Sequence, residues 1–322
     1  MVKNHPGLRP PFQRRGICLC RLLEFKQTSL DLFNTHVPFS QSLTPKPFYK
    51  VITFPNCKIN LGLWVTQRRP DGYHNIQTVM IPVPWCDILE IMPTNGNETT
   101  VAVSGIRIDS LWENNLCYKA WRLMDDKYGI PPVSIHLHKV IPAGAGLGGG
   151  SSDGSFTLKM LNAMFKLNLD NETLLSLAVQ LGMDCSFFIE NIPSLSTGRG
   201  EVLKPVSINL DGYIMIVKPP VHVSTAAAFL GTKPLYRENS IDEITTHPVQ
   251  DWKYELHNDF EKTVFDLYPE IQDIRNLMYR HGAIYSSMSG SGSAVYGLFT
   301  KKPAEIDFPG CNVFQTLLGS HA

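Results

Sequence analysis

A run of residues with almost no large side chains, 142–153, limits most strictly how this chain can fold. It reads Pro-Ala-Gly-Ala-Gly-Leu-Gly-Gly-Gly-Ser-Ser-Asp, and Leu147 is its single large apolar residue. Glycine tolerates the positive φ values that turn backbone N–H groups inward, so such a run favours an anion-binding loop. Apolar and polar residues alternate in 133–138, and apolar residues recur at helical spacing from Phe156 to Leu167. We therefore expect a strand, a glycine loop and a helix.

The order strand, loop and helix suits a phosphate chain, because the loop amides and the helix N-terminus both carry positive potential. A Walker A loop is excluded, since no Gly-Lys-Ser or Gly-Lys-Thr ends the run. Gly144, Gly146 and Gly149 satisfy the dinucleotide motif GxGxxG, with Asp170 about where a ribose-binding acid would lie. The segment 166–169 is a poor strand, however, which disfavours a dinucleotide site.

Two hydroxyls at the end of the run favour a third interpretation. Ser151 and Ser152 follow the glycines directly. Hydroxyl groups beside an amide cradle reach a magnesium ion that bridges nucleotide phosphates, as phosphoryl transfer requires. The run therefore favours ATP and Mg²⁺ over a dinucleotide.

Composition excludes several other classes of protein. The 322 residues include 29 basic and 29 acidic side chains, and 43% of the residues are apolar. The length favours two domains, and the balanced charge gives no reason to expect a nucleic-acid partner. No apolar run approaches the roughly 18 residues that a membrane span needs. The seven cysteines are scattered without a CxxC pair, so we expect reduced thiols in a cytosol-like compartment.

Residues 1–50 differ from the rest of the chain. They contain prolines, few acidic residues and no sustained periodicity, and the ordered pattern begins at Val51. We interpret them as a disordered leader or the product of an early-assigned start codon, with an organelle transit peptide as the alternative. A second change of pattern follows Pro205.

Lys58 and Asp184 are ionisable residues in apolar surroundings. Alternation over 57–65 predicts a strand with Lys58 and Asn60 on one face. The residues expected on the other face are Cys57, Ile59, Leu61, Leu63 and Val65. A lysine on a strand is usually solvated, and Asp184, just before the apolar run 185–189, is either partly desolvated or a helix cap. Both residues are candidate catalytic residues, but the pattern alone does not decide between a catalytic and a structural role.

The segment that follows this predicted strand contains a turn motif. Pro70-Asp71-Gly72 is a turn signal that places Tyr73 and His74 side by side. The pattern fits a surface hairpin as well as a ligand contact.

The remaining pattern predicts alternating elements. A helix over 116–124 has Asn114 as its expected cap and Gly129 as its stop, and a helix over 174–181 ends at Gly182. Further expected elements are strands at 88–92, 100–103 and 213–217, a short helix at 223–229, a loop at 233–250, a helix at 271–278, and strands at 283–287 and 294–299 around a glycine-serine loop at 289–293.

Several motifs together resemble one family. The run from Pro142 to Ser152 resembles the ATP loop of the GHMP kinases, and 289–293 resembles their C-terminal glycine motif. Within this superfamily, Cys57-Lys-Ile-Asn-Leu-Gly-Leu and Arg69-Pro-Asp-Gly-Tyr-His74 resemble the kinases that act on 4-diphosphocytidyl-2-C-methyl-D-erythritol. The resemblance extends from Val51 to the C-terminus.

The resemblance implies an α+β, two-domain GHMP kinase fold. Residues 51–205 would form an N-terminal ATP-binding domain similar to ribosomal protein S5 domain 2. Residues 206–322 would form a ferredoxin-like C-terminal domain. ATP and substrate would lie between them.

The resemblance also implies roles for individual residues. Lys58 and Asp184 match the family's catalytic pair: Asp184 would accept the proton of a tertiary 2-hydroxyl, and Lys58 would stabilise both the ionised aspartate and the transferred phosphoryl group. Tyr73 would stack on the cytosine, His74 would hydrogen-bond its edge, and Phe229 would cover the opposite face. Asp153 departs from the small or amide residue of many relatives and receives no catalytic role.

The other implied contacts divide between the two ligands. Those to the adenine nucleotide are Asn115, Lys139, Pro142, Gly144, Gly146, Leu147, Gly148, Gly149, Gly150, Ser151 and Ser152, with Ser151 and Ser152 also near Mg²⁺. Those to the substrate are Asn60, Gly290, Ser291 and Gly292, besides the aromatic residues.

The expected cofactors are therefore ATP and Mg²⁺, and the expected partner is the small-molecule substrate. We expect no nucleic-acid or membrane partner, a monomer or weak homodimer, and a bacterial cytoplasmic location, with a plastid only if the leader is a transit peptide. Two alternatives remain: a homoserine-type or mevalonate-type GHMP kinase, and a non-catalytic nucleotide-binding protein. The turn at Asp71–His74 favours the cytidyl substrate, because only a pyrimidine needs that aromatic and imidazole pair.

Overall fold

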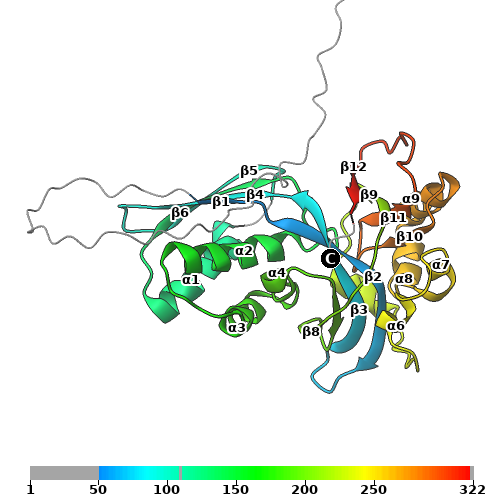
Figure 1. The fold of residues 1–322 in the computed structure, drawn as a ribbon, viewed down its shortest axis with the longest axis horizontal. Coiled ribbons are helices and arrows are strands. Elements are labelled where there is room, and N and C mark those ends of the chain that lie inside the picture. The colour runs from blue at the N-terminus through cyan, green and yellow to red at the C-terminus, as the bar shows by residue number, and fades with distance from the viewer. Residues whose placement is uncertain (1–50, 109–110, 320–322) are drawn as a thin grey trace, which may run out of the picture. The chain divides into compact units, whose positions relative to one another are not determined.

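The computed structural model describes residues 51–108 and 111–319, which form three four-stranded sheets with helices packed against them (Figure 1). The described residues belong to one compact unit. The expected leader, 1–50, lies outside the described residues, together with Cys18 and Cys20.

The first sheet has the strand order β1-β4-β6-β5. Its strands are β1 (Val51–Thr53), β4 (Ile88–Pro93), β6 (Val133–Lys139) and β5 (Thr100–Gly105). β5 and β6 are parallel neighbours, and the other pairs are antiparallel. A parallel pair needs a long crossover, which here contains a helix.

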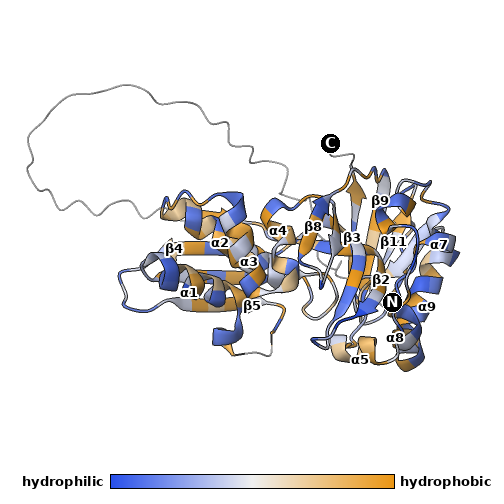
Figure 2. Ribbon diagram, turned by 90° about the horizontal axis from the view of Figure 1, so that it is seen from below, coloured by the Kyte–Doolittle hydropathy of each residue, from blue (hydrophilic) through white to orange (hydrophobic). Residues whose placement is uncertain are grey.

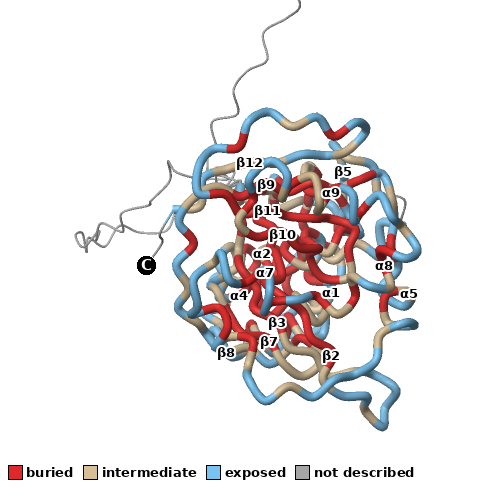
Figure 3. The backbone as a smooth tube through the Cα atoms, turned by 90° about the vertical axis from the view of Figure 1, so that its right-hand side faces the viewer, coloured by how far each residue is buried: buried red, intermediate tan, exposed pale blue. Residues whose placement is uncertain are grey.

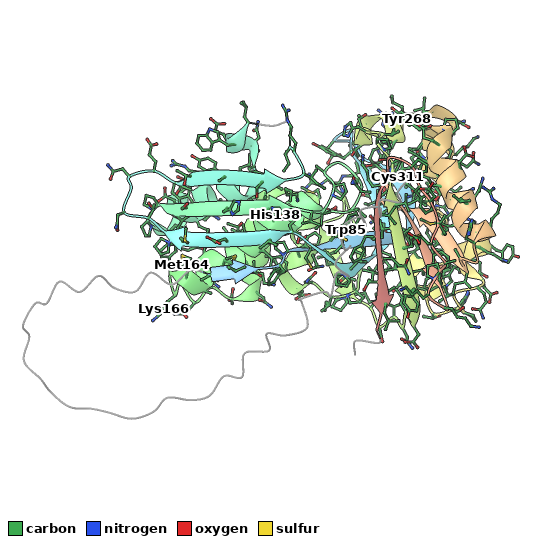
Figure 4. All side chains as sticks on the ribbon, turned by 90° about the horizontal axis from the view of Figure 1, so that it is seen from above. Trp85, His138, Met164, Lys166, Tyr268 and Cys311 are labelled. Carbon is green, nitrogen blue, oxygen red and sulfur yellow. The ribbon has the colours of Figure 1, made fainter. Side chains whose placement is uncertain are left out.

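Three helices cover one face of this sheet (Figure 1). They are α1 (Leu116–Tyr128), α2 (Gly149–Met164) and α3 (Asn171–Leu181). Ile135 and Leu137 of β6 pack against them, whereas His136 and His138 alternate onto the other face, where Figure 4 labels His138. There Ser104 Oγ lies within hydrogen-bonding distance of both imidazoles, at 2.9 and 3.0 Å.

The caps of α1 confirm one expectation and correct another. Gly129 ends the helix with φ +62°, as expected of a C-terminal glycine. The N-cap is Asn115 rather than Asn114, because the Asn115 side chain accepts the backbone N–H of Cys117 at 2.9 Å. Asn114 instead belongs to a short 3₁₀ turn, Trp112–Asn114.

The second sheet is a long hairpin extended by two short strands. β2 (Asn56–Arg68) pairs with β3 (His74–Cys86), followed by β7 (Ser194–Thr197) and β8 (Val202–Pro205). A bulge between Leu61 and Trp64, with Gly62 at φ +59°, shifts the alternation of β2. The expectation that Leu63 and Val65 share the face of Leu61 is therefore wrong: they belong to a different core cluster, and Trp64 takes their place beside Leu61.

The third sheet has the order β10-β11-β9-β12. Its antiparallel strands are β9 (Gly212–Lys218), β10 (Tyr285–Met288), β11 (Val295–Phe299) and β12 (Asn312–Leu318). If β9, β10, β11 and β12 are numbered 1 to 4 in chain order, the strand order read from β12 is 4-1-3-2, which is that of the ferredoxin-like topology. Residues 300–311, all of them described, contain no helix between the last two strands.

Helices α5 (Thr225–Leu230), α8 (Glu261–Leu267) and α9 (Pro269–Arg280) pack on this third sheet. Figure 2 shows the hydrophobic residues of β9 and β11 beside the more hydrophilic α9. Trp85 at the end of β3, labelled in Figure 4, stacks on Phe314 of β12 with ring centroids 5.1 Å apart. The second and third sheets therefore share one hydrophobic core.

Short helices complete the chain: α4 (Phe187–Glu190), α6 (Ile241–Ile244) and α7 (Trp252–Glu255). The predicted loop over 233–250 contains α6, because Ile241 and Ile244 are buried and give that turn an apolar contact. Figure 3 shows the buried segments around β3, β10 and β11, with exposed loops at the periphery.

In the described ranges no helix has the length and apolar character needed to cross a membrane.

Candidate active site

The glycine loop connects β6 to α2, as the sequence predicts. Gly144, Gly146 and Gly148 have φ values of +62°, +76° and +69°. These angles favour glycine, and Gly146 has a second reason to lack a side chain: a Cβ there would lie 1.9 Å from the carbonyl oxygen of Ser289. The loop therefore depends on glycine both for its conformation and for its contact with the second glycine-serine loop.

Hydrogen bonds fix this loop to two other segments. The backbone N–H of Lys58 on β2 donates to the carbonyl of Leu147 at 2.9 Å. In the second loop, Ser289 Oγ donates to the carbonyl of Gly146 at 2.9 Å, and the N–H of Ala294 donates to the carbonyl of Ala145 at 3.1 Å. These bonds use carbonyl oxygens of the first loop and leave its amides available for a ligand.

The N-terminus of α2 follows the loop without a side-chain cap. Gly148 is the N-cap, and the first intrahelical bond runs from the N–H of Ser152 to its carbonyl at 2.9 Å. The N–H groups of the first helical residues have no intrahelical partner, so they are suited to an anion. Ser151 is half-buried there, whereas Ser152 is buried and its hydroxyl has no hydrogen-bond partner in the described part of the chain.

Lys58 and Asp184, far apart in the sequence, form an ion pair. Lys58 Nζ lies 3.2 Å from Asp184 Oδ2, and the exposed fractions of the two side chains are 4% and 33%. Asp184 lies in a short 3₁₀ turn, Met183–Cys185, just after α3, with the buried helix α4 beyond it. The aspartate is thus the accessible member of the pair, and the lysine is the buried one.

The glycine loop covers this lysine. A Cβ built on Gly148 would lie 3.1 Å from both Cγ and Cε of Lys58. Lys58 therefore passes beneath the loop on its way to Asp184, which is one reason why Gly148 lacks a side chain.

Asn60 is buried beside the pair, with both ends of its amide engaged. Lys58 Nζ donates to Asn60 Oδ1, and Asn60 Nδ2 donates to Thr78 Oγ1 at 3.1 Å. Thr78 Oγ1 in turn donates to the carbonyl of Gly62 at 2.6 Å. The amide of Asn60 thus orients the ammonium group, and its predicted substrate contact stays a prediction. Thr78 was missed in the sequence because β3 was not recognised as a long strand.

The second glycine-serine loop completes this side of the site. A Cβ on Gly290 would lie 3.2 Å from Asn60 Oδ1. Asn258 Nδ2 donates to the carbonyls of Met288 and Gly290, both at 2.8 Å. The structure thus brings Asn60, Gly146 and Gly290 together, while the ligand contacts of Gly290, Ser291 and Gly292 stay predictions.

The aromatic turn lies at the end of the β2–β3 hairpin. Tyr73 is 60% exposed, and the Arg199 guanidinium lies 5.5 Å from its ring centroid. His74 stacks on Phe229, with centroids 4.8 Å apart and an interplanar angle of 16°. Phe229 therefore lies close to the turn, and its contact with the cytosine stays a prediction. Arg199 was missed because nothing in the sequence connects it to the turn.

Asn115 and Lys139, the two remaining nucleotide candidates, have structural partners. Asn115 caps α1, as described above. Lys139 Nζ is buried and donates to Asp87 and to Asp153 Oδ2, the latter at 2.8 Å. Asp87 Oδ1 also accepts the N–H groups of Val140 and Ile141 at 2.6 and 2.8 Å. Asp87, which the sequence analysis missed, holds the chain where it leaves β6 for the glycine loop.

Asp153, which received no role from sequence, shares this buried cluster. Its Oδ1 has no hydrogen-bond partner in the described residues. Burial raises the pKa of Asp153 to about 7, against the opposing effect of Lys139. Lys139 is therefore the shared partner of two buried carboxylates, those of Asp87 and Asp153, near the N-terminus of α2.

Comparison with known proteins places this arrangement in a family. Residues 115–191 match the GHMP kinases N terminal domain, and residues 244–307 match the GHMP kinases C terminal model. Solved structures of a homoserine kinase from Cytophaga hutchinsonii and a mevalonate kinase from Methanococcus jannaschii share the fold. They are 16% and 14% identical with TM-scores of 0.55 and 0.60, and they cover 87% and 84% of this chain and 98% and 99% of theirs. The fold is that of a two-domain GHMP kinase.

More similar relatives define the family more narrowly. A 4-diphosphocytidyl-2-C-methyl-D-erythritol kinase from Bacteroides fragilis is 49% identical over 83% of this chain and 100% of its own length. A crystal structure of a 4-(cytidine 5'-diphospho)-2C-methyl-D-erythritol kinase is 32% identical, with a TM-score of 0.67 over 77% of this chain and 90% of that one. The chain therefore belongs to the 4-diphosphocytidyl-2-C-methyl-D-erythritol kinase family.

The raised pKa of Asp153 predicts how stability changes with pH. In the folded state its pKa is about 7, above the ordinary value of 3.8. The folded state therefore binds the extra proton between these values, and this stabilisation, complete below about pH 4, is lost as the pH rises through 7. Between pH 5 and 7 the wild type should lose stability relative to Asp153→Asn as the pH rises, by about 1 kcal/mol per pH unit.

Urea denaturation of both proteins from pH 5 to 8 measures this difference. Asp273→Asn, an exposed change on α9, is the matched control and should follow the wild type. Parallel curves for the wild type and Asp153→Asn would show that Asp153 does not titrate in this range.

Proposed function

We propose that this protein transfers the γ-phosphoryl group of ATP to the tertiary 2-hydroxyl of 4-diphosphocytidyl-2-C-methyl-D-erythritol, a step of the non-mevalonate isoprenoid pathway. The observation that carries the proposal is the ion pair of Lys58 and Asp184 beneath the glycine loop. The names of relatives that align along their whole length support the choice of substrate.

The nucleotide half of the site would be built from backbone. The loop from Pro142 to Gly150 and the uncapped start of α2 would bind the phosphates through N–H groups. Asn115 and Lys139 would contact the nucleotide as the resemblance implies. The side chains of both have protein partners. The N–H of Asn115 also donates to the carbonyl of Trp112, and the carbonyl of Lys139 accepts the N–H of Ile106, so a contact with the nucleotide would share or replace one of these bonds.

Magnesium would be held mainly by the phosphates of ATP. The described residues contain no group of three or more histidine, cysteine, aspartate or glutamate side chains suited to a metal ion. Of the two predicted hydroxyls, that of the half-buried Ser151 is the more accessible, since Ser152 is buried. The donors present therefore fit an ion shared between ATP and Ser151, and its charge would offset that of the phosphates.

Lys58 would act through the third hydrogen of its ammonium group. An ammonium group has three N–H donors, and Asn60 Oδ1 and Asp184 Oδ2 occupy two of them. The third would meet an oxygen of the γ-phosphoryl group, where it offsets charge in the transition state.

Asp184 would orient the acceptor hydroxyl and take its proton. A tertiary alcohol is a crowded and weakly acidic nucleophile, so it needs both positioning and a base. As its oxygen bonds to the γ-phosphorus, the bond from that phosphorus to the bridging oxygen breaks and ADP leaves. The exposure of the aspartate beside a buried lysine supports this division of roles.

The aromatic turn would recognise the cytosine. Tyr73 would stack on the ring, and His74 would hydrogen-bond its edge. In the structure the imidazole of His74 stacks on the ring of Phe229. Two stacked rings 4.8 Å apart leave no room for a base, so the cytosine would either separate them or bind on the Tyr73 side.

We further propose that the two domains meet near residue 205.

A substrate comparison tests the proposed function. Purified protein is incubated with ATP, Mg²⁺ and, in separate reactions, 4-diphosphocytidyl-2-C-methyl-D-erythritol, homoserine or mevalonate, and ADP release is followed. We expect turnover with the cytidyl substrate alone. Phosphorylation of only homoserine or mevalonate would make the substrate assignment wrong, and no turnover with any of them would favour a non-catalytic nucleotide-binding protein.

Replacing Asp184 tests its assigned role. Asp184→Asn should lower kcat by about 10²–10⁴-fold, because the amide cannot accept the proton. ADP affinity, measured by calorimetry, should stay within a few-fold, and Asp273→Asn should resemble the wild type in both measurements. Equal losses of turnover and ADP affinity would make Asp184 a structural residue instead.

A further inference from the structure

The segment 221–225, which follows β9 and ends at the first residue of α5, borders the second glycine-serine loop. Ser293 Oγ donates to the carbonyl of Val221 at 2.6 Å, and Lys218 Nζ donates to the same oxygen at 3.0 Å. Thr225 Oγ1 and Ser291 Oγ share a hydrogen bond at 3.2 Å. Hydrogen bonds therefore hold the chain on both sides of residue 222, through the Val221 carbonyl and the Thr225 hydroxyl.

The same segment places His222 against the first glycine loop. A Cβ built on Gly144 would lie 2.9 Å from Nδ1 and 3.0 Å from Cε1 of His222. The imidazole thus occupies the space that a side chain at position 144 would need. His222 is the contact between this segment and the predicted ATP loop, just as Thr225 is a contact with the predicted substrate loop.

The imidazole of His222 is an available donor in this place. His222 is exposed, and its ring makes no hydrogen bond or ion pair with the described residues. The two lysines predicted at the site differ in this respect: Lys58 is paired with Asp184, and Lys139 with Asp87 and Asp153. A phosphate chain carries several negative charges, and a charge-assisted hydrogen bond is among the stronger polar contacts.

We propose that His222 is a phosphate-binding residue, whose imidazole donates a hydrogen bond to an oxygen of the phosphate chain held between the two glycine loops. The proposal rests on the proposed function, which brings two such chains to the site. One is the triphosphate of ATP, beside Gly144, and the other is the diphosphate of the cytidyl substrate, beside Ser291. Either chain presents the same oxygen chemistry to His222.

Binding of ADP and of CDP to the full-length protein distinguishes the two sources. ADP carries the first two phosphates of ATP, and CDP carries the cytidine diphosphate of the substrate. His222→Leu removes the donor, and His222→Gln retains an N–H donor. His281→Leu, at the exposed end of α9, is the matched control.

We expect His222→Leu to weaken the calorimetric affinity for one probe by about tenfold or more, as for loss of a hydrogen bond to a charged group. His222→Gln should restore most of it, and KM for the corresponding substrate should change in parallel, with kcat less affected. A loss confined to ADP assigns His222 to the ATP chain, and a loss confined to CDP assigns it to the substrate chain.

Two results would overturn the proposal. Affinities for both probes and KM values for ATP and the cytidyl substrate, all within twofold of the wild type in His222→Leu, would show that the imidazole binds no phosphate. Equal losses in His222→Leu and His222→Gln, accompanied by a lower Tm, would make the residue structural. Failure of the proposed function is a separate result, namely no turnover of the cytidyl substrate by the wild type.

Discussion

The contact between the two glycine loops is the interaction on which the rest of the site depends. Gly146 approaches the carbonyl of Ser289 so closely that no side chain fits between them. The first loop comes from the sheet of β4 and β6, and the second connects two strands of the ferredoxin-like sheet. Because Lys58 on β2 also bonds to the first loop, segments of three sheets meet at one place. Neither loop alone could define where a phosphoryl group and its acceptor meet.

The charges around these loops fall into two groups with different consequences. Lys58 pairs with an accessible aspartate, so its ion pair can face a substrate. Lys139 pairs with Asp87 and Asp153 away from water, and Asp87 also binds two backbone N–H groups where β6 ends. Removing one member of a buried cluster leaves an uncompensated charge, so such a cluster favours one backbone arrangement over alternatives. We interpret Lys58 as a catalytic residue and Lys139 as a residue that stabilises the conformation of the glycine loop.

Local sequence signals predicted the elements that carry the site. The glycines at 144–150, the alternation in 133–138 and the helical stops at Gly129 and Gly182 depend on neighbouring residues, and the structure has the corresponding elements. The motif order also predicted the family. The pairing of Lys58 with Asp184 followed from the resemblance and not from spacing, because the residues lie on different elements.

Other features depend on contacts that no local pattern contains. The bulge at Gly62 reassigns Leu63 and Val65 to another core, which simple alternation cannot anticipate. The resemblance implies a nucleotide contact for Lys139, which stays a prediction; no local pattern indicates that Asp87, 52 residues away, and Asp153 bind its ammonium group. His222 and Arg199 carry no motif and become notable only through their neighbours in space.

Steady-state kinetics of Gly146→Ala tests the central claim most directly. The added Cβ would meet the Ser289 carbonyl and separate the loops. Gly129→Ala is its control, because Gly129 has a similar φ of +62° with nothing within 4 Å of an added Cβ. The account predicts that Gly146→Ala lowers kcat/KM for both ATP and the cytidyl substrate by about 10²-fold relative to Gly129→Ala. Kinetics equal to those of Gly129→Ala would contradict it.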